Sequence, residues 1–365
     1  MTRCVAQMIK ICMVAGDHSG DLHAAALARS IKQLNADARI TALGGKHLMA
    51  SADSFSENLV DINAFGFAAA AQQYLKLKQI FKDSIINAWD RQRPDKVVLV
   101  DYYGFNIHVA EEAKRRGIPV YYYISPQVWA TRPGRIKRLA RCVKKMLVIL
   151  PFEEKLYRQA GVDAVFVGHP LIDIVPEPLP HEAGDTAVIG LFPGSRKTAI
   201  NAHCAILEKA ANIIRKEFPA ECRFFGLRGH EADYPVSLPV IFDSDYTEHR
   251  KLDLALTVSG TVCLEHALLG IPMTVMYKLS AFNYLLARML VRIPYITMAN
   301  ILLDKPLVPE LIQGMATPEK IASNALQLLR NRDAFQSMRR QLLSIRKMLG
   351  APGVSARVAG IILKE

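Results

Sequence analysis

The stretch TVSGTVCLEHALLGIPMTVMYK, from Thr257 to Lys278, decides the fold because it combines a strand, a turn, a helix and a second strand. The apolar run LALTV leads into the turn Ser259-Gly260-Thr261, whose residues are typical of a helix start. The helix is expected to stop at Gly270, with a proline just beyond it. A strand, a helix and a strand in succession predict a right-handed parallel unit of an open α/β sheet.

The Ser-Gly-Thr turn is expected at the carboxyl end of its strand, where open α/β sheets bind ligands. Free N–H groups at a helix start suit a phosphate, so Ser259, Gly260 and Thr261 are predicted to contact a nucleotide. Glu265 lies one helical turn later on the same side, within reach of a ribose diol. The alternative is a capped surface helix with an ordinary exposed glutamate, and this stretch alone leaves both open.

Length and composition favour a globular chain with two domains, since 365 residues that are 51% hydrophobic can bury a large core. The six cysteines form no CxxC pair, which favours reduced thiols over disulfides or a zinc site. The amino terminus lacks the regions of a signal peptide. The longest apolar run, AFGFAAAA, has eight residues, whereas a membrane span needs roughly 20.

The chain carries 46 basic and 34 acidic residues, a net charge of +12, which indicates an anionic partner. No helix-turn-helix, zinc finger or RNA-binding signature is recognisable, so nucleic acid is disfavoured. A membrane surface and a phosphorylated small molecule are therefore the expected anionic partners.

The first half of the chain reads as alternating strands and helices, which is a doubly wound α/β pattern. A strand, a glycine turn and an amphipathic helix are predicted over 10–34, and further strands at 39–45, 97–106 and 120–125, with helices between them. The first turn, Gly16 to Asp21, is not the GxGxxG dinucleotide fingerprint because its glycines are four positions apart. A plain Rossmann dehydrogenase is therefore disfavoured.

The segment from Phe65 to Trp89 is predicted to form a helix with bulky side chains on one side and lysines beside them. Phe67, Tyr74 and Phe81 recur at helical spacing, and such a helix can lie among lipid headgroups. A buried helix with lysines that reach out to solvent explains the same pattern.

A second basic segment holds seven basic residues between Arg132 and Lys145, with no acidic residue among them. It is either a solvated helix face or a binding strip for an anionic lipid or phosphate. The proline-rich and acidic segment from Asp173 to Thr186 is the best linker. After it, the run AVIGLFPGSRKTAI restarts the α/β pattern.

In this second turn Gly194 allows close approach of the backbone to a ligand, Ser195 is expected to cap the helix, and Arg196 is placed for a phosphate. The alternative is a capped surface turn with an exposed arginine. Two α/β halves joined by a linker predict two Rossmann-like domains that face a cleft.

Together these motifs resemble the lipid A disaccharide synthase family, which are inverting GT-B glycosyltransferases of glycosyltransferase family 19. The matching stretches follow the family order along nearly the whole chain: AG-x-x-SGD, SPQVWA with RPGRIKR, LPFE, FVGHPL, FPGSR, SGTVCLEHALLGIPM, and NILL with VPELIQ. The resemblance implies an N-terminal acceptor and membrane-facing domain over 1–172 and a UDP-sugar domain over 187–338. A helical segment over 339–365 is expected to pack back on the first domain.

The implied reaction transfers 2,3-diacylglucosamine from its UDP donor to 2,3-diacylglucosamine 1-phosphate, forming a β-1,6 disaccharide and UDP. It implies no metal or other cofactor and an anionic membrane partner at the cytoplasmic face of the inner membrane; the oligomeric state stays open. Asp101, at the end of the strand VVLVD, is the candidate general base, which takes the acceptor proton; the alternative is that Asp101 is a structural cap. Ser19, Gly20, Gln127 and Asn300 are further candidate substrate contacts.

The chain departs from the family pattern at several positions. Where the family reads Asp-x-Pro-Asp-Phe-Asn, residues 101–106 are Asp-Tyr-Tyr-Gly-Phe-Asn, so the second acid is missing. Asp17 replaces a glutamate, Thr131 a tryptophan, and Ala199 an acid. Another UDP-sugar enzyme of the same fold, such as a UDP-N-acetylglucosamine 2-epimerase, and a non-catalytic paralogue that binds sugar nucleotides or lipids are the alternatives.

Overall fold

A computed structural model of the chain describes residues 8–63, 70–131, 134–180, 184–229, 231–280, 284–285 and 293–365. The chain divides into two compact units. The first unit comprises Met1–Pro170 and Leu349–Glu365, and the second comprises Leu171–Met348. The sequence placed the last boundary at residue 339, but helix α16 (Arg332–Met348) belongs to the second unit, so the returning segment begins at Leu349.

The first unit is built on a seven-stranded parallel sheet with the strand order β3-β2-β1-β4-β5-β6-β7. The chain starts in the middle with β1, builds outward to β3, and then crosses back to β4. The switch point of this sheet therefore lies between β1 and β4. The strands are β1 (Lys10–Ala15), β2 (Arg39–Gly44), β3 (Ser54–Asn58), β4 (Lys96–Val100), β5 (Val120–Tyr123), β6 (Lys145–Val148) and β7 (Ala164–Phe166).

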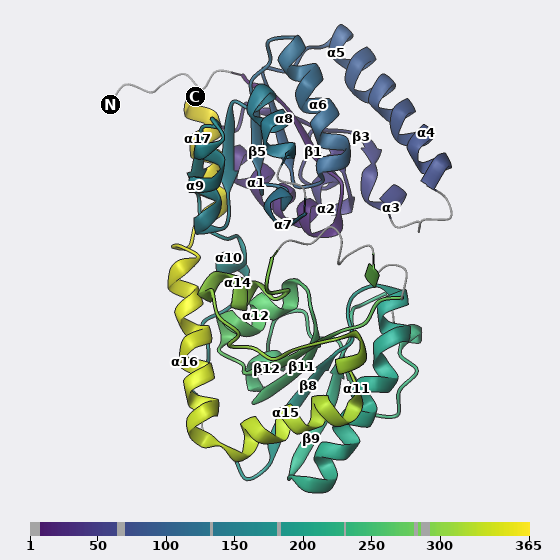
Figure 1. Ribbon diagram of the computed structural model, residues 1–365. Helices are drawn as coiled ribbons and strands as arrows, with labels where there is room; N and C mark the ends of the chain where they lie inside the picture. The colour runs from purple at the N-terminus through teal and green to yellow at the C-terminus, as the bar shows by residue number, and fades with distance from the viewer. Residues whose placement is uncertain are drawn as a thin grey trace. The chain divides into compact units, whose positions relative to one another are not determined.

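Helices cover both faces of this sheet (Figure 1). They are α1 (His18–Leu34), α2 (Lys46–Met49), α3 (Leu59–Asn63), α4 (Ala70–Ile80), the π-helical η2 (Phe81–Asn87), α5 (Ala88–Arg91), α6 (Tyr103–Arg115), α7 (Val128–Thr131), α8 (Arg135–Cys142), α9 (Pro151–Gln159) and α17 (Val354–Lys364). Because both faces are covered, the central strands β1, β4 and β5 are almost entirely apolar, whereas the edge strand β3 (SFSEN) is polar.

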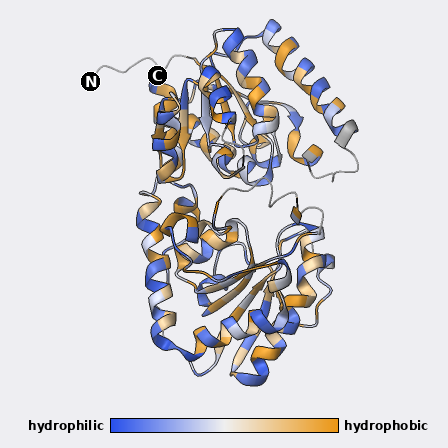
Figure 2. Ribbon diagram, in the orientation of Figure 1, coloured by the Kyte–Doolittle hydropathy of each residue, from blue (hydrophilic) through white to orange (hydrophobic). Residues whose placement is uncertain are grey.

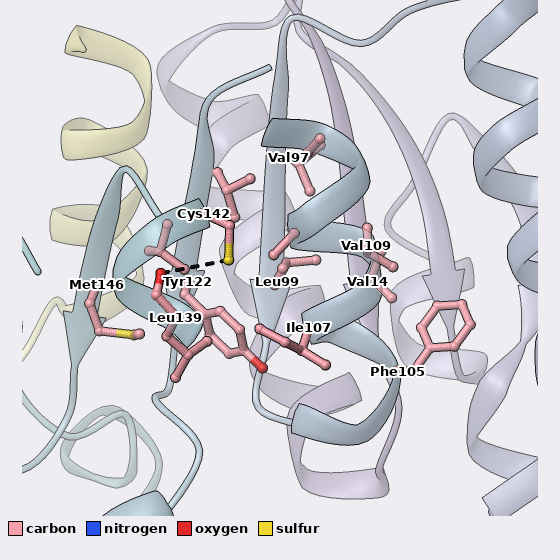
Figure 3. Packing of buried hydrophobic residues seen from close by; sticks show 14 of the residues in the cluster. Val14, Val97, Leu99, Phe105, Ile107, Val109, Tyr122, Leu139, Cys142 and Met146 are labelled. Carbon is pink, nitrogen blue, oxygen red and sulfur yellow. Dashed lines mark hydrogen bonds between the residues drawn. The ribbon is translucent and has the colours of Figure 1, made fainter. Parts of the chain in front are cut away.

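Alternation along the strands divides the core of the first unit into two layers. Val97 and Leu99 of β4 point to one face, whereas Val98 and Val100 point to the other. Figure 3 shows the first layer, in which strand residues pack against side chains of α6 and α8, among them Phe105, Ile107, Val109, Leu139 and Cys142. The second layer is covered by α1 and α17.

The C-terminal helix α17 belongs to this second layer and packs along α1. The Lys96 ammonium group, which is buried, donates to the Ile362 carbonyl oxygen at 2.5 Å, and Lys145 pairs with the Glu365 carboxylate. The last helix of the chain thus completes the core of the first unit.

The second unit is built on a six-stranded parallel sheet with the order β10-β9-β8-β11-β12-β13. Its switch point lies between β8 and β11. The strands are β8 (Ala187–Phe192), β9 (Ala220–Phe225), β10 (Val240–Ile241), β11 (Leu254–Val258), β12 (Met273–Tyr277) and β13 (Glu310–Ile312). The helices are α10 (Leu171–Ile174), α11 (Lys197–Glu217), α12 (Thr261–Leu269), α14 (Met298–Leu303), α15 (Pro318–Arg330) and α16, with the 3₁₀ turns η3 (Glu231–Asp233), η4 (His249–Lys251) and η5 (Gln313–Met315).

The hydropathy of the helices follows this layering. Helix α4 shows alternating blue and orange bands in Figure 2, as expected of a helix with one apolar side. The strand-turn-helix-strand unit predicted over 254–277 is present as β11, α12 and β12, and the two strands pair in parallel. Gly270 ends α12 in the left-handed conformation, with φ +68°.

Candidate functional site

In the second unit, the two predicted nucleotide turns lie next to each other. The turn Gly194-Ser195-Arg196 follows β8 and the turn Ser259-Gly260-Thr261 follows β11, and these strands are neighbours that pair Phe192 with Thr257. Both turns therefore lie at the carboxyl edge of the sheet, at its switch point, where parallel α/β sheets bind ligands.

The first turn needs a glycine at position 194. Its φ is +110°, and a Cβ there would lie 3.1 Å from the Ala199 Cβ and 3.2 Å from the Val258 side chain. Helix α11 begins at Lys197, and Arg196 is its N-cap without a side-chain hydrogen bond. The prediction that Ser195 caps this helix is therefore wrong. Ser195 and Arg196 are both exposed, so their side chains are accessible to a ligand.

The second turn also lacks a side-chain cap. Gly260 is the N-cap of α12, and the Ser259 hydroxyl donates instead to the Ile296 carbonyl oxygen at 3.0 Å. The sequence predicted a side-chain N-cap in this turn, but no side chain of the turn caps α12. Gly260 and Thr261 are exposed, and the uncapped N–H groups at the start of α12 have the geometry that suits an anion.

Glu265 lies one turn into α12 and is half-buried. Burial raises its pKa to about 7, against the opposing effect of a hydrogen bond from Tyr246. Tyr246 has a φ of +65° and stacks on His249, with 5.6 Å between ring centroids. Sequence reasoning missed Tyr246 because it lies in an irregular stretch without periodicity.

The buried side chain of His203 contacts the backbone just before the first turn. His203 of α11 places Nδ1 3.1 Å from the Pro193 carbonyl oxygen and Nε2 3.3 Å from the Lys278 carbonyl oxygen. It thereby connects the ends of β8 and β12. Its place on the buried side of an amphipathic helix is the only sequence signal that indicates this role.

Asn300 is fully engaged inside the second unit. Its amide nitrogen donates to the Val308 carbonyl oxygen and to the Glu310 carboxylate, each at 2.9 Å, and its amide oxygen accepts from the Val308 N–H at 2.8 Å. The side chain is completely buried. We therefore correct the expectation that Asn300 contacts substrate: it holds the segment before β13 in place.

In the first unit, Asp17 follows β1 and Asp101 follows β4, so both flank the switch point of this sheet. Asp17 caps α1, since its carboxylate accepts the Gly20 N–H at 2.6 Å and the Ser19 hydroxyl at 3.1 Å. Gly20 is buried and its N–H is used in this cap, whereas Ser19 is exposed. Gly20 therefore shapes the turn, and Ser19 is the accessible one of the two.

The backbone around Asp101 is strained. Asp101, Tyr102 and Ile124 have φ values of +46°, +44° and +59°, which non-glycine residues rarely adopt. The Asp101 N–H donates to the carbonyl oxygens of Tyr123 and Ile124, and its own carbonyl oxygen accepts from the Tyr122 hydroxyl at 2.5 Å and the Asn106 amide at 2.9 Å. Such strain persists where the surroundings fix it, and it concentrates at functional sites.

The Asp101 side chain has a high proton affinity for a carboxylate. Its pKa is raised from 3.8 to about 7, first by burial and then by the negative charge of Asp17, with a smaller contribution from Glu153. The backbone N–H of Tyr102 acts in the opposite direction. A pKa near neutrality suits a group that accepts a proton during a reaction.

Gln127 lies in the loop between β5 and α7 and is exposed. The residues around it are buried and held by α9, so Gln127 is the accessible side chain of a fixed loop.

The basic segment is partly neutralised. Arg138 of α8 forms two hydrogen bonds to Glu111, Lys145 pairs with Asp163 and Glu365, and Arg135 lies over the Tyr103 ring with its guanidinium carbon 4.3 Å from the centroid. Lys137 and Arg141 remain exposed on α8.

The predicted membrane residues have different positions in the fold. Tyr74 is 67% exposed and Leu75 beside it 64% exposed. Phe81 instead packs against Phe105 and His108, with ring centroids 6.1 and 6.4 Å away, so it belongs to the core side and not to an exposed face. Phe67 lies outside the described residues. None of the helices in the described ranges is both long enough and apolar enough to span a bilayer.

Among the described residues, no three His, Cys, Asp or Glu side chains are grouped as metal ligands would be. The carboxylates of Asp17 and Asp101, at the first switch point, accept hydrogen bonds from groups of the chain.

Two parallel α/β sheets, each with its candidate residues at its own switch point, define a two-domain protein of GT-B architecture. The solved structures that it resembles agree: a Neisseria meningitidis UDP-GlcNAc 2-epimerase bound to UDP-GlcNAc (TM-score 0.66, 13% identity, 98% of this chain and 100% of that one) and Medicago truncatula UGT71G1 complexed with UDP-glucose (TM-score 0.62, 12% identity, 99% and 98%). At these identities the likeness shows the fold alone.

The sequence comparisons are more specific. The family model for lipid-A-disaccharide synthetase matches residues 11–356. The lipid-A-disaccharide synthases of Syntrophus aciditrophicus and Geobacter metallireducens are each 36% identical to the chain, over 97% of both sequences. The chain belongs to the lipid-A-disaccharide synthetase family, and it is therefore a glycosyltransferase of lipid A biosynthesis. The predicted fold class and family are confirmed.

Proposed function

We propose that the chain transfers 2,3-diacylglucosamine from UDP-2,3-diacylglucosamine to the 6-hydroxyl of 2,3-diacylglucosamine 1-phosphate, and that Asp101 is the general base. The observation that carries the proposal is the buried Asp101 carboxylate at the first switch point, with a pKa of about 7, in a member of this family. A base of this strength is largely ionised just above neutral pH and still takes up a proton readily.

In the proposed reaction the acceptor hydroxyl oxygen forms a bond to the anomeric carbon of the donor sugar. The bond from this carbon to the UDP oxygen breaks, and UDP leaves with the electron pair. The hydroxyl proton passes to the Asp101 carboxylate. Attack and departure on opposite sides of the sugar ring invert the configuration, which gives the β-linkage.

The donor nucleotide is assigned to the second switch point. Gly194, Ser195 and Arg196 and the turn Ser259-Gly260-Thr261 are proposed to hold the diphosphate, with the starts of α11 and α12 directed at it. Glu265 is proposed to accept hydrogen bonds from the ribose hydroxyls. These groups and Arg196 are proposed to stabilise the charge on UDP, with no metal or other cofactor.

The acceptor is assigned to the first unit, with Ser19 and Gln127 as its accessible polar contacts beside Asp101. For the lipid part, we propose that the enzyme is peripheral at the cytoplasmic face of the inner membrane. The exposed Tyr74 and Leu75 support this, because Lys76 and Lys78 beside them are also exposed and can meet anionic headgroups.

The test is incubation of the purified protein with both diacylated substrates in the presence of a chelator, with mass detection of the products. The expected products are the disaccharide 1-phosphate and UDP in equal amounts. Hydrolysis or epimerisation of the donor without disaccharide would contradict the proposed transfer, and loss of turnover on chelation would contradict its independence of metal.

A further inference from the structure

Glu153 is a buried carboxylate close to the candidate base. It lies in the first turn of α9 and is 1% exposed. Its Oε1 accepts the Ser125 hydroxyl at 2.7 Å and the Trp129 indole N–H at 3.0 Å, while Oε2 accepts the Leu150 N–H at 3.2 Å. Both oxygens are thus engaged, and two of the donors lie in the segment after β5, Ser125 in its loop and Trp129 in the first turn of α7.

The neighbours of Glu153 on α9 hold the same loop. The Phe152 ring meets the Trp129 ring edge to face at 5.0 Å, and the Tyr157 hydroxyl donates to the Pro126 carbonyl oxygen at 3.2 Å. The loop from Ser125 to Trp129 is therefore fixed at four points by one helix. Gln127, between these points, is exposed.

The residue that precedes this fixed loop is hydrogen-bonded to the backbone of Asp101. Ile124 precedes Ser125 and accepts the Asp101 N–H at 3.1 Å, while its own N–H donates to the Leu147 carbonyl oxygen at 3.1 Å. Ile124 is β-branched and has a φ of +59°, a conformation that this residue type strongly disfavours. A conformation of this kind requires support from its surroundings, and the bonds of Ser125 to α9 supply it.

We propose that Glu153 is a positioning residue of the active site: its carboxylate holds the Ser125–Trp129 loop against α9, and through Ile124 it fixes the backbone of Asp101. This inference rests on the proposed role of Asp101 as the base. Glu153 itself is enclosed and does not touch substrate.

Glu153 also acts on the charge of Asp101. Burial raises the pKa of Glu153 to about 7, and its negative charge raises the pKa of Asp101. The other titratable groups that face Asp101 are Asp17 and the phenols of Tyr122 and Tyr157. Because this charge is one of the causes that raise the pKa of Asp101, its removal is expected to lower the pKa of Asp101.

Two substitutions separate the structural and the electrostatic contribution. Glu153→Gln keeps one oxygen that can accept from both Ser125 and Trp129, but it removes the charge and the oxygen that accepts the Leu150 N–H. We expect most of kcat to remain and the acid limb of kcat/KM to move to lower pH. Glu153→Ala removes the bonds as well, and we expect kcat to fall by about 10²-fold, the effect of a small misplacement of a catalytic group, with unchanged affinity for UDP.

Glu154→Gln is the matched control, because Glu154 is the next residue of α9 but accepts from the Phe166 N–H and pairs with Arg158. Its pH profile is expected to equal that of the wild type. A profile of Glu153→Gln that coincides with the wild type, or an unchanged kcat in Glu153→Ala, would overturn the proposal.

A second measurement is independent of turnover. The chain has two tryptophans, so protein labelled with 5-fluorotryptophan gives two ¹⁹F resonances, and Trp129→Phe assigns them. The Trp129 resonance is expected to shift with pH as Glu153 titrates, and not in Glu153→Gln. A shift that persists in Glu153→Gln contradicts the proposal. If no disaccharide forms in the wild type, this titration still tests the contact of Glu153 with the loop, so the two failures are distinguishable.

Discussion

The substitution Asp101→Asn changes activity and stability in opposite directions. Asparagine keeps the size of the side chain and an oxygen that can accept the Tyr102 N–H, but it cannot take up the acceptor proton. General base catalysis contributes about 10²–10⁴-fold, so kcat is expected to fall by this factor. UDP affinity is expected to stay the same, since the nucleotide is assigned to the second unit.

The stability effect follows from the raised pKa. In the unfolded chain Asp101 loses its proton near pH 3.8, whereas in the folded chain it keeps the proton up to about pH 7. The folded state binds more protons in this window, so the free energy of unfolding of the wild type decreases as pH rises through it. The shift is about 3 pKa units, and at ~1.4 kcal/mol per unit the upper limit of this cost is about 4 kcal/mol.

The variant has no carboxylate at this position, so its free energy of unfolding does not decrease in this way. Its advantage in the free energy of unfolding is expected to be small at pH 4, to grow between pH 4 and 7, and to stay constant above pH 7. Urea denaturation of both proteins at a series of pH values measures it, beside initial rates of transfer. Asp37→Asn, at an exposed aspartate, is the control and should change neither quantity. A stability difference that does not depend on pH, or near-normal turnover of Asp101→Asn, would refute the reasoning.

The other predictions concern the nucleotide turn, the internal network, the membrane face and the missing acid. Glu265→Ala is expected to weaken UDP binding about tenfold or more, because a hydrogen bond to a charged group contributes about 1.5–3 kcal/mol; calorimetry showing unchanged affinity would remove its ribose role. Asn300→Ala is expected to lower the free energy of unfolding by about 1–3 kcal/mol, as buried partners lose their bonds, with unchanged UDP affinity in the folded protein; weaker UDP binding at equal stability would return Asn300 to the site. Tyr74→Ser combined with Leu75→Ser should reduce flotation with anionic vesicles at unchanged thermal stability, and equal flotation would speak against this face. Gly104→Asp should fold and stay active, because a Cβ there meets nothing within 4 Å and an acid in the first turn of α6 adds about 0.3–1 kcal/mol; turnover as low as in Asp101→Asn would show that the substrate needs this space.

Much of the fold was predictable because parallel strands covered on both faces are continuous apolar runs. The strands β1, β4, β8 and β11 were all visible in this way. The edge strand β3 was not, since its sequence SFSEN is polar, and β10, with two residues, is too short to show a pattern. The boundary at Leu349 was also hidden, because amphipathic helices such as α16 and α17 do not reveal in one sequence which unit they cover.

The candidate site was only partly predictable. Position in a strand-turn-helix unit is a local property, and it placed Arg196 and Asp101 after the carboxyl ends of their strands and Glu265 one turn into the helix that follows β11. Capping and network contacts depend on the tertiary structure. Ser195 was therefore expected to cap a helix that it does not cap, and Asn300 to meet a substrate when its three hydrogen bonds are internal. Tyr246 had no signal in the sequence.

Three neighbouring carboxylates are candidates for the base. The hydrogen bonds that each already accepts, its pKa and its exposure to a substrate decide between them. Asp17 is partly accessible, but its carboxylate already accepts an N–H and a hydroxyl as the N-cap of α1. Glu153 has a raised pKa but is 1% exposed, so no acceptor hydroxyl can reach it. Asp101 combines a raised pKa with partial exposure at the switch point. Proton uptake from a bound alcohol requires both properties, and Asp101 has them.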